Sequence, residues 1–246
     1  MLKGHTDWVI SLAFAPDGKK ALTGSKDGSL IYWDLECSEP ILRLFSAPND
    51  NWSLAISPDG RTALSDAALG GVIYWDLERG QEIRRLVRDD ETETHGVSGL
   101  AYLPDGQSAV SGGNDGYLIQ WDLKTGNEIR RFGRHDDIRT RVEISPDGKL
   151  MLSSGMNGVL RLWDLGSGEL IREFGYTGPA VVFDIALSPD GRTALSGSVD
   201  QTITQWAIED PTLEDLLIWI EANRYVCKLA CDEMARYQIE PLCSQE

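Results

Sequence analysis

One tripeptide recurs along the chain and constrains its fold more than any other feature. Pro-Asp-Gly begins at five positions, Pro16, Pro58, Pro104, Pro146 and Pro189. A tryptophan follows each proline 17 residues later, at Trp33, Trp75, Trp121, Trp163 and Trp206. Successive prolines lie 42 to 46 residues apart, so the length varies only outside the constant Pro-to-Trp block. A constant block with variable connections is typical of a repeated supersecondary unit.

Each block has the pattern of short antiparallel strands. An alternating apolar run precedes each Pro-Asp-Gly, as at Leu12 and Phe14. Pro-Asp-Gly is itself a turn, because proline presets φ and glycine accepts positive φ. An Asp27-Gly28 type of hairpin turn follows, then a strand that carries the tryptophan, then a fourth apolar run such as 41–45. Four antiparallel strands in each repeat predict the blade of a β-propeller.

The ends of the third strands carry a resemblance to a known family. Trp is followed by Asp in four of the five units, at 33–34, 75–76, 121–122 and 163–164, and the first unit opens with Gly4-His5. Over residues 1–208 the chain therefore resembles the WD40 repeat family. This implies an all-β fold, a β-propeller of about five four-stranded antiparallel blades or an incomplete arc of a larger propeller. The repeats would cover about 4–47, 48–91, 92–134, 135–177 and 178–208.

The resemblance also implies a hydrogen-bonded network within a blade, made by a His, a strand Ser or Thr, a turn Asp and the Trp. The first unit matches it completely, with His5, Thr23, Asp27 and Trp33. The fourth unit nearly matches it, with His135, Ser153, Asn157 and Trp163. No His aligns in the other units, and Leu69 stands where the second unit should have its turn Asp. We expect those blades to depend more on apolar packing.

Residues 209–246 predict a short C-terminal α-helical tail. Thr212 and Asp215 form a capping box, and Leu213, Leu216 and Leu217 share one helical face. The tail resembles the C-terminus of large bacterial multidomain WD-repeat proteins. That resemblance implies a signalling protein in which other domains precede the propeller. Only three residues precede Gly4-His5 and no fourth strand follows 203–208, so we expect the C-terminal portion of a longer protein.

The charge of the chain argues against some classes of partner, and its cysteines indicate its cellular setting. The net charge of −16 argues against binding to nucleic acid or to an anionic membrane surface. No stretch approaches the ~20 apolar residues of a membrane helix, and the N-terminus lacks the apolar core of a signal peptide. The four cysteines show no pairing framework, which indicates a reducing, cytoplasmic setting.

The sequence predicts neither a cofactor nor a metal. Each Pro-Asp-Gly supplies one carboxylate, whereas calcium takes about six to eight oxygen ligands. The tail cysteines Cys227, Cys231 and Cys243 lack a nearby fourth ligand for zinc. No catalytic residue is predicted either, because His5 and His135 fit the blade network and no nucleophile can be paired with a base. An enzyme with a site in the central channel would need a convergent polar cluster on the channel wall, and we expect no such set.

The positions that vary most between the units predict a docking surface for a protein partner. They lie eight and six residues before each repeated Pro and seven before each Trp, and the resemblance places them at one end of the propeller. The candidates are Trp8, Ile10, Lys26, Asp50, Trp52, Asn114, Ile138, Thr140, Met156 and Phe183. Exposed aromatic side chains indicate an interface, since such anchors dominate binding energy. The alternative is that neighbouring blades bury several of them.

We therefore expect a protein-interaction scaffold or a ligand-sensing module rather than an enzyme. Two alternatives stay open. One is a propeller enzyme with a channel site, and the other is an assembly module that pairs through open blade edges, because unpaired strands recruit other strands.

Overall fold

The computed structural model describes residues 1–45, 53–67, 71–88, 96–135, 140–175 and 181–208. The chain divides into two compact units, Met1–Ile208 and Glu209–Glu246. The second unit, with the predicted helical tail and its cysteines, lies outside the described residues.

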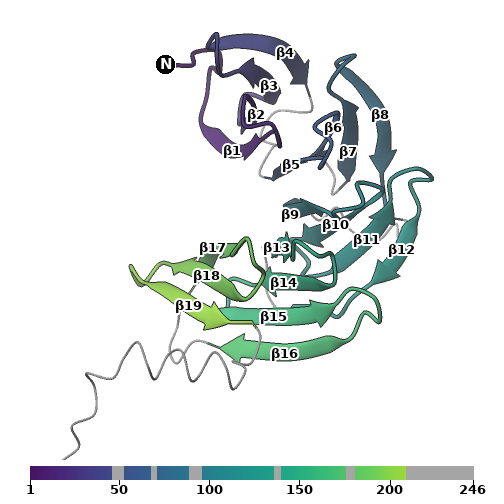
Figure 1. Ribbon diagram of the computed structural model, residues 1–246, viewed down its shortest axis with the longest axis vertical. Coiled ribbons are helices and arrows are strands. Elements are labelled where there is room, and N and C mark those ends of the chain that lie inside the picture. The colour runs from purple at the N-terminus through teal and green to yellow at the C-terminus, as the bar shows by residue number, and fades with distance from the viewer. Residues whose placement is uncertain (46–52, 68–70, 89–95, 136–139, 176–180, 209–246) are drawn as a thin grey trace, which may run out of the picture. The chain divides into compact units, whose positions relative to one another are not determined.

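The described part of the first unit consists of β-strands in five antiparallel sheets, which follow one another in chain order (Figure 1). Blade 1 contains β1 (Val9–Phe14), β2 (Lys20–Ser25), β3 (Ser29–Asp34) and β4 (Glu39–Phe45). Blade 2 contains β5 (Leu54–Ile56), β6 (Thr62–Asp66), β7 (Val72–Asp76) and β8 (Gln81–Leu86). Blade 3 contains β9 (Val97–Tyr102), β10 (Ser108–Gly113), β11 (Leu118–Asp122) and β12 (Glu128–Arg131).

Blades 4 and 5 differ in the number of their strands. Blade 4 contains β13 (Arg141–Ile144), β14 (Leu150–Ser154), β15 (Val159–Asp164) and β16 (Leu170–Gly175). Blade 5 contains β17 (Val182–Leu187), β18 (Thr193–Ser198) and β19 (Ile203–Ala207). These five sheets confirm the predicted all-β propeller, and the described part of blade 5 has three strands where the other blades have four.

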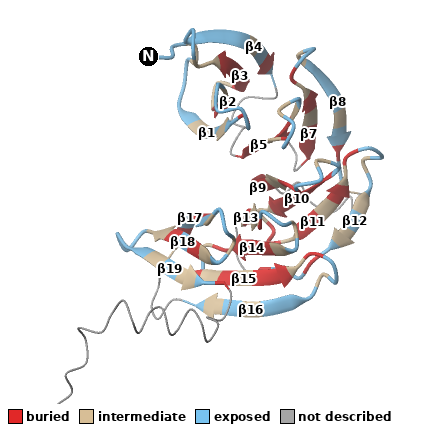
Figure 2. Ribbon diagram, viewed as in Figure 1, coloured by how far each residue is buried: buried red, intermediate tan, exposed pale blue. Residues whose placement is uncertain are grey.

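The first strand of each blade lies toward the common centre, and the fourth strands of blades 1 to 4 lie on the outside (Figure 1). Successive first strands contact one another, β1 with β5, β5 with β9, β9 with β13, and β13 with β17. The third strand β3 is mostly buried and β15 is buried or half-buried throughout, whereas the outer strands β4, β8 and β16 are largely exposed (Figure 2). Residues at the start and end of each first strand are therefore placed at the two mouths of a central channel.

The turn chemistry expected of Pro-Asp-Gly is present in every blade. The glycine of each copy has a positive φ, at Gly18, Gly60, Gly106, Gly148 and Gly191. The aspartate side chain accepts a hydrogen bond from the backbone two residues later, as when Lys19 N–H donates to Asp17 Oδ1 at 2.8 Å. Proline and glycine set the dihedral angles while the carboxylate satisfies the turn, so this local sequence determines the hairpin between the first and second strands.

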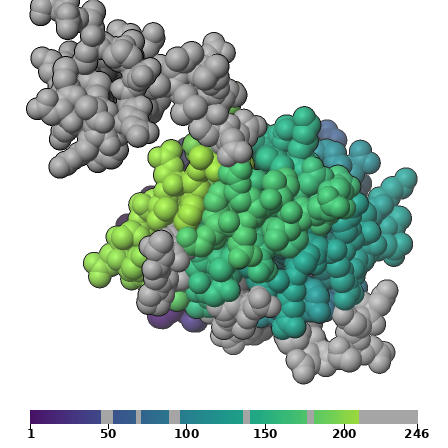
Figure 3. Space-filling view, turned by 90° about the horizontal axis from the view of Figure 1, so that it is seen from below, coloured from purple at the N-terminus to yellow at the C-terminus, as the bar shows by residue number. Residues whose placement is uncertain are grey.

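The apolar core lies in the joints between successive blades. Leu22 and Leu30 of blade 1 share a buried cluster with Leu54 of blade 2, and the later joints repeat this arrangement. Blades 4 and 5 are seen packed against each other in the space-filling view (Figure 3). Each blade therefore depends on its neighbours for the burial of its two faces.

Candidate functional site

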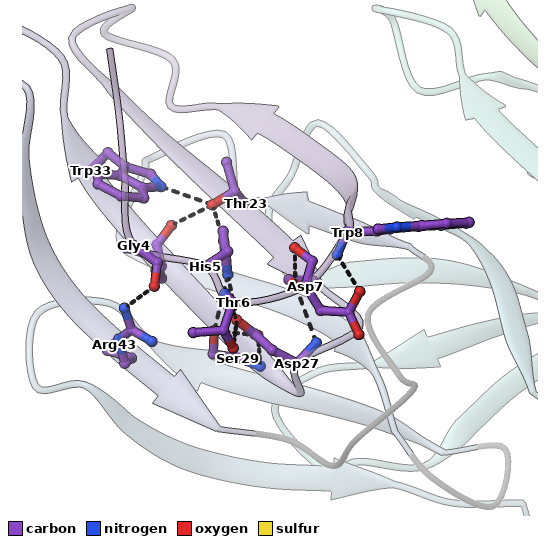
Figure 4. Close-up of polar contacts among 12 residues, drawn as sticks. Gly4, His5, Thr6, Asp7, Trp8, Thr23, Asp27, Ser29, Trp33 and Arg43 are labelled. Carbon is purple, nitrogen blue, oxygen red and sulfur yellow. Dashed lines mark hydrogen bonds and ion pairs between the residues drawn. The ribbon is translucent and has the colours of Figure 1, made fainter.

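The structure brings the four predicted network residues of blade 1 together (Figure 4). His5 Nε2 lies 2.7 Å from Thr23 Oγ1, and Trp33 Nε1 donates to the same oxygen at 2.8 Å. On its other side, His5 Nδ1 lies 3.3 Å from Asp27 Oδ2 and 3.0 Å from Ser29 Oγ. The network ties the segment before β1 to the second and third strands. Ser29 was not among the predicted residues.

Two opposed effects set the charges in this network. Burial lowers the pKa of His5 by more than the nearby Asp27 raises it, so the imidazole is neutral at pH 7 and the contact is a hydrogen bond rather than an ion pair. Burial also opposes the charge of Asp27. Hydrogen bonds from the Ser29 hydroxyl and from the backbone of Thr6 and Ser29 outweigh it and hold the pKa of Asp27 far below its usual range. The network is thus built around one carboxylate and a neutral histidine.

The Trp-to-hydroxyl bond extends to all five blades. The indole N–H donates to a serine of the second strand at Ser65, Ser111, Ser153 and Ser196, over distances of 2.7 to 3.0 Å. In blade 4, the fully buried His135 approaches Ser153 at 2.8 Å, and Asn157 accepts the N–H of Val159. The blades without an aligned His therefore keep the hydrogen bond from the Trp to the second-strand serine.

In blade 3, two arginines contact the turn Asp in place of the missing His, and comparison of the repeats did not predict this. Arg88 forms an ion pair with the turn residue Asp115, and the side chain of Arg134 donates to the backbone oxygen of Asp115 at 2.8 Å. Both guanidinium groups also lie over the ring of Tyr117. Arg88 precedes the third repeat, which contains its partner Asp115, so the alignment of the repeats did not predict this ion pair.

The predicted docking residues divide into exposed and buried ones. Trp8 is 70% exposed, and the Nζ of Lys26 lies 4.2 Å from the centre of its ring. Phe183 is 51% exposed, whereas Ile10 is half-buried. The expectation is wrong for Thr140, which is fully buried because it packs closely against Gly112 of blade 3, and its hydroxyl donates to Gly113 O at 3.1 Å. The candidates Asp50, Trp52 and Ile138 lie outside the described residues.

Three of the predicted residues, from three different blades, line one pocket. Asn114, Met156 and Phe183 surround a cavity of about 180 Å³ together with Val97, Ser98, Arg141 and Val182. Asn114 and Met156 occupy the same turn position of blades 3 and 4, and Phe183 occupies the start of the first strand of blade 5. We call Trp8, Lys26, Asn114, Met156 and Phe183 the docking face.

The central channel holds a charged cluster, contrary to expectation. Its cavity of about 570 Å³ is lined by the first strands of all five blades. Arg141, Glu143 and Asp184 lie on the wall formed by blades 4 and 5. Four units have alanine where the fourth has Glu143, at 13, 55, 101 and 186, so a position-by-position comparison of the repeats could have found it.

Arg141 joins three blades at this wall. Its guanidinium donates to Ser98 O of blade 3 at 2.7 Å and to Phe183 O of blade 5 at 3.2 Å, and it lies 3.9 Å from an oxygen of Asp184. Burial, with a smaller contribution from Asp184, raises the pKa of Glu143 to about 7. Arg141 is therefore a structural clamp, and Glu143 exchanges a proton near neutral pH.

Among the residues that the structure describes, no helix is long and apolar enough to cross a membrane. The same part of the chain contains no group of three or more His, Cys, Asp or Glu side chains placed to hold a metal ion.

Comparison with known families agrees with the repeat geometry. The family described as WD domain, G-beta repeat matches residues 1–34, 86–122, 126–164 and 168–207, more than half of the chain. This chain belongs to the WD40 repeat family. The second repeat, at about 48–91, falls almost entirely between the matched stretches, in keeping with Leu69 at the position of its turn Asp.

Shorter similarities exist to three named proteins. The chain is 37% identical over 60 residues to the small ribosomal subunit protein RACK1z of Arabidopsis thaliana, which is 21% of this chain and 18% of that protein. It is equally similar to small ribosomal subunit protein RACK1 of Brassica napus. It is 50% identical over 34 residues to nuclear distribution protein PAC1 of Candida albicans, which is 14% of this chain and 7% of that protein. The matches span less than a fifth of each relative.

Proposed function

We propose that this WD40 chain is a protein-interaction module whose partner binds the docking face. The observation that carries the proposal is the pocket of Asn114, Met156 and Phe183, which unites variable positions from three repeats. Variation at these positions changes what is bound without disturbing the blades, because the residues that build the blades lie elsewhere in each repeat.

The chemistry of the docking face fits a peptide or loop with an apolar anchor. The pocket of about 180 Å³ has room for one large side chain, and Phe183 at its rim is half exposed. On blade 1, Trp8 offers a flat aromatic surface that the ammonium of Lys26 already covers in part. Aromatic and methionine side chains of this kind are enriched where proteins bind one another.

The family supports the same function. WD40 propellers generally bind protein partners. The RACK1 relatives are named as proteins of the small ribosomal subunit, so the similar repeat in them belongs to a multi-component assembly. We extend to this chain only the general role of binding a protein.

The channel cluster does not favour an enzyme. Arg141 is committed to two backbone carbonyl oxygens, so its geometry serves the joints between blades. Glu143 and Asp184 are carboxylates, and Arg141 lies 3.9 Å from an oxygen of Asp184, so this part of the wall also serves to hold blades 4 and 5 together. We therefore propose that the chain acts by binding and not by catalysis.

The setting of the module is proposed from sequence alone. The resemblance of the tail supports a bacterial signalling protein with further domains before the propeller, and the unpaired cysteine pattern supports the cytoplasm. The gene itself tests this, because an open reading frame without a signalling domain would contradict it.

A selection experiment tests the docking face. A peptide library displayed on phage is selected against the full chain, and the strongest peptide is measured by calorimetry. Met156→Asp and Phe183→Asp should each weaken binding at least about tenfold, because a carboxylate replaces an apolar contact in the pocket. Ile129→Asp is the matched control, since Ile129 is an exposed side chain of the outer strand β12.

The controls decide where binding occurs. Unchanged affinity in Ile129→Asp together with a loss in both pocket variants supports the docking face. If Glu143→Gln abolishes binding while the pocket variants bind normally, the site is the channel and the proposal is wrong.

A further inference from the structure

The described lining of the docking-face pocket contains one charged side chain, that of Arg141, although the chain as a whole carries a net charge of −16. The rest of the lining is neutral. It consists of Val97, Val182, Met156 and Phe183, which are apolar, and of Ser98 and Asn114, which are polar. The carboxylates of Glu143 and Asp184 line the channel cavity and are not part of this pocket. An apolar pocket with a guanidinium group in its wall suits a ligand that is apolar and carries an anion.

The guanidinium group of Arg141 has hydrogen-bond donors that the protein does not use. A guanidinium carries five N–H donors. In Arg141, Nε donates to Phe183 O at 3.2 Å and Nη1 donates to Ser98 O at 2.7 Å. Asp184 Oδ1 lies 3.9 Å from Nε, beyond hydrogen-bond distance, and the Asp184 side chain is 82% exposed. Within the described part of the chain, both N–H groups of Nη2 and the second one of Nη1 are therefore unpaired.

The two hydrogen bonds that Arg141 does make hold its side chain in place. They connect blade 4 to blade 3 and to blade 5, and the side chain is 33% exposed. A side chain that is already ordered loses little freedom when a ligand binds. Hydrogen bonds from a guanidinium to a carboxylate are also stronger than those between neutral groups. Arg141 is thus preorganised to bind a carboxylate at the pocket.

Asn114 supplies a further donor at the same pocket. Its side-chain amide makes no hydrogen bond within the described residues, and its Oδ1 is buried. The amide therefore has Nδ2 available for a ligand, and an amide N–H favours an acceptor such as a carboxylate oxygen.

The fold of a blade does not explain the arginine. Arg141 lies five residues before the Pro of its repeat, and the equivalents in the other repeats are Ser11, Ser53, Gly99 and Asp184. Four blades form without a cation at this position, so a blade does not require one. An arginine that is particular to one repeat and faces a pocket is consistent with a role in binding.

We propose that the pocket binds the C-terminal residue of a partner protein, with its α-carboxylate on Arg141 and its apolar side chain against Met156 and Phe183. The inference rests on the proposed function, because it names the chemistry of the partner at the same site. A C-terminal residue carries both groups on one Cα, so both fit a cavity of about 180 Å³. An internal aspartate or glutamate would leave the apolar walls uncovered, which favours a chain terminus.

Peptides in two chemical forms test the carboxylate. An array of hexapeptides that end in Leu, Ile, Val, Phe or Met is probed with the full chain, as free acids and as C-terminal amides. The strongest binder is then measured in both forms by calorimetry. The free acid should bind at least about tenfold more tightly, because the amide lacks the charge that Arg141 recognises. An amidated peptide with an internal Asp should bind no better than the plain amide.

Two variants of the chain locate the carboxylate. Arg141→Gln should reduce the ratio of the acid and amide affinities to about one, with circular dichroism to verify that the blades remain folded. Asn114→Asp leaves the hydrogen bonds of Arg141 intact and places a second carboxylate at the pocket. It should lower the acid-to-amide ratio at least about tenfold, because like charges repel. Ile129→Asp, on the outer strand β12, is the control and should keep the wild-type ratio.

Failure of this inference differs from failure of the proposed function. Acid and amide peptides that bind equally well, and that both lose affinity in Met156→Asp, would overturn the carboxylate and leave the docking face as the binding site. Stronger binding of the internal acid, or an unchanged ratio in folded Arg141→Gln, would overturn it in the same way. Free acids that bind Met156→Asp as well as wild type would contradict both proposals. The absence of binding by any array peptide would overturn the inference, while the peptides selected from phage would still test the proposed function.

Discussion

At the scale of single residues, His5 stabilises blade 1 as a neutral hydrogen-bonding group. Its removal leaves Thr23, Asp27 and Ser29 without the imidazole that they contact. We predict that His5→Ala lowers the free energy of unfolding by about 1–3 kcal/mol, measured by urea denaturation at pH 8.

The pH dependence gives this prediction its sign. Burial lowers the pKa of His5 below its ordinary 6.5, so the unfolded chain binds a proton more readily than the folded one. The stabilisation is complete above pH 6.5 and decreases as the pH falls through that value. The difference between wild type and His5→Ala should shrink accordingly, and a difference that is constant from pH 8 to pH 5 would contradict this account.

Glu143 makes the stability depend on pH in the opposite direction. Its pKa is about 7 in the folded chain against an ordinary 4.5, so the folded state binds more protons than the unfolded state between these values. The stability of the wild type should therefore fall as the pH rises from 4.5 to 7. Glu143→Gln should remove this slope and be the more stable protein at pH 8, by on the order of 1–3 kcal/mol. Parallel unfolding curves of the two proteins at all pH values would contradict the buried, charge-facing position of Glu143.

At the scale of a turn, Gln201 of blade 5 carries backbone strain that the equivalent turns of blades 1, 3 and 4 avoid. Gln201 has a φ of 69°, whereas its equivalents are Gly28, Gly116 and Gly158, with φ of 80° to 83°. Side chains with a Cβ pay a cost in this left-handed region. Gln201→Gly should raise stability by about 1 kcal/mol, and Gly158→Gln should lower it by a similar amount, in thermal melts. A loss of stability in Gln201→Gly would mean that the glutamine side chain contributes more than the strain costs.

At the scale of a strand, the repeated tryptophans differ in burial. Trp121 is 3% exposed between blades 2 and 3, while Trp206 in blade 5 is only half-buried. Trp121→Ala should cost about 3–5 kcal/mol, the usual range for a buried aromatic side chain. Trp206→Ala should cost clearly less. Equal losses in guanidinium denaturation would show that blade 5 is as well covered as blade 3.

At the scale of the whole propeller, stability should fall toward the ends. Blades 2, 3 and 4 are covered on both faces, whereas blades 1 and 5 each leave one apolar face exposed. In a repeat protein, stability is approximately a sum over units and their joints. Amide hydrogens of β10 and β14 should exchange at least about tenfold more slowly than those of β18, measured by mass spectrometry on dilute, monomeric protein. Uniform protection would contradict this gradient.

The sequence by itself determined the elements and their order. Pro-Asp-Gly sets its own turn, the apolar alternation marks each strand, and the tryptophan spacing gives the register of the blade. It also predicted the network of His5, Thr23, Asp27 and Trp33, because all four belong to one repeat. These interactions are local, so the repeat is sufficient to predict them.

Only the tertiary structure decided what each position faces. Leu12 and Leu54 occupy the same position of the repeat, yet Leu12 is exposed and Leu54 is buried. Blade 1 packs against Leu54 in blade 2, whereas no described blade packs against Leu12. Thr140 looked available to a partner and is buried by blade 3. Glu143 stands close to Asp184 across two blades, a contact that no single repeat contains. Burial and charge proximity between repeats depend on the neighbouring blade, and the repeat pattern does not encode which neighbour is present.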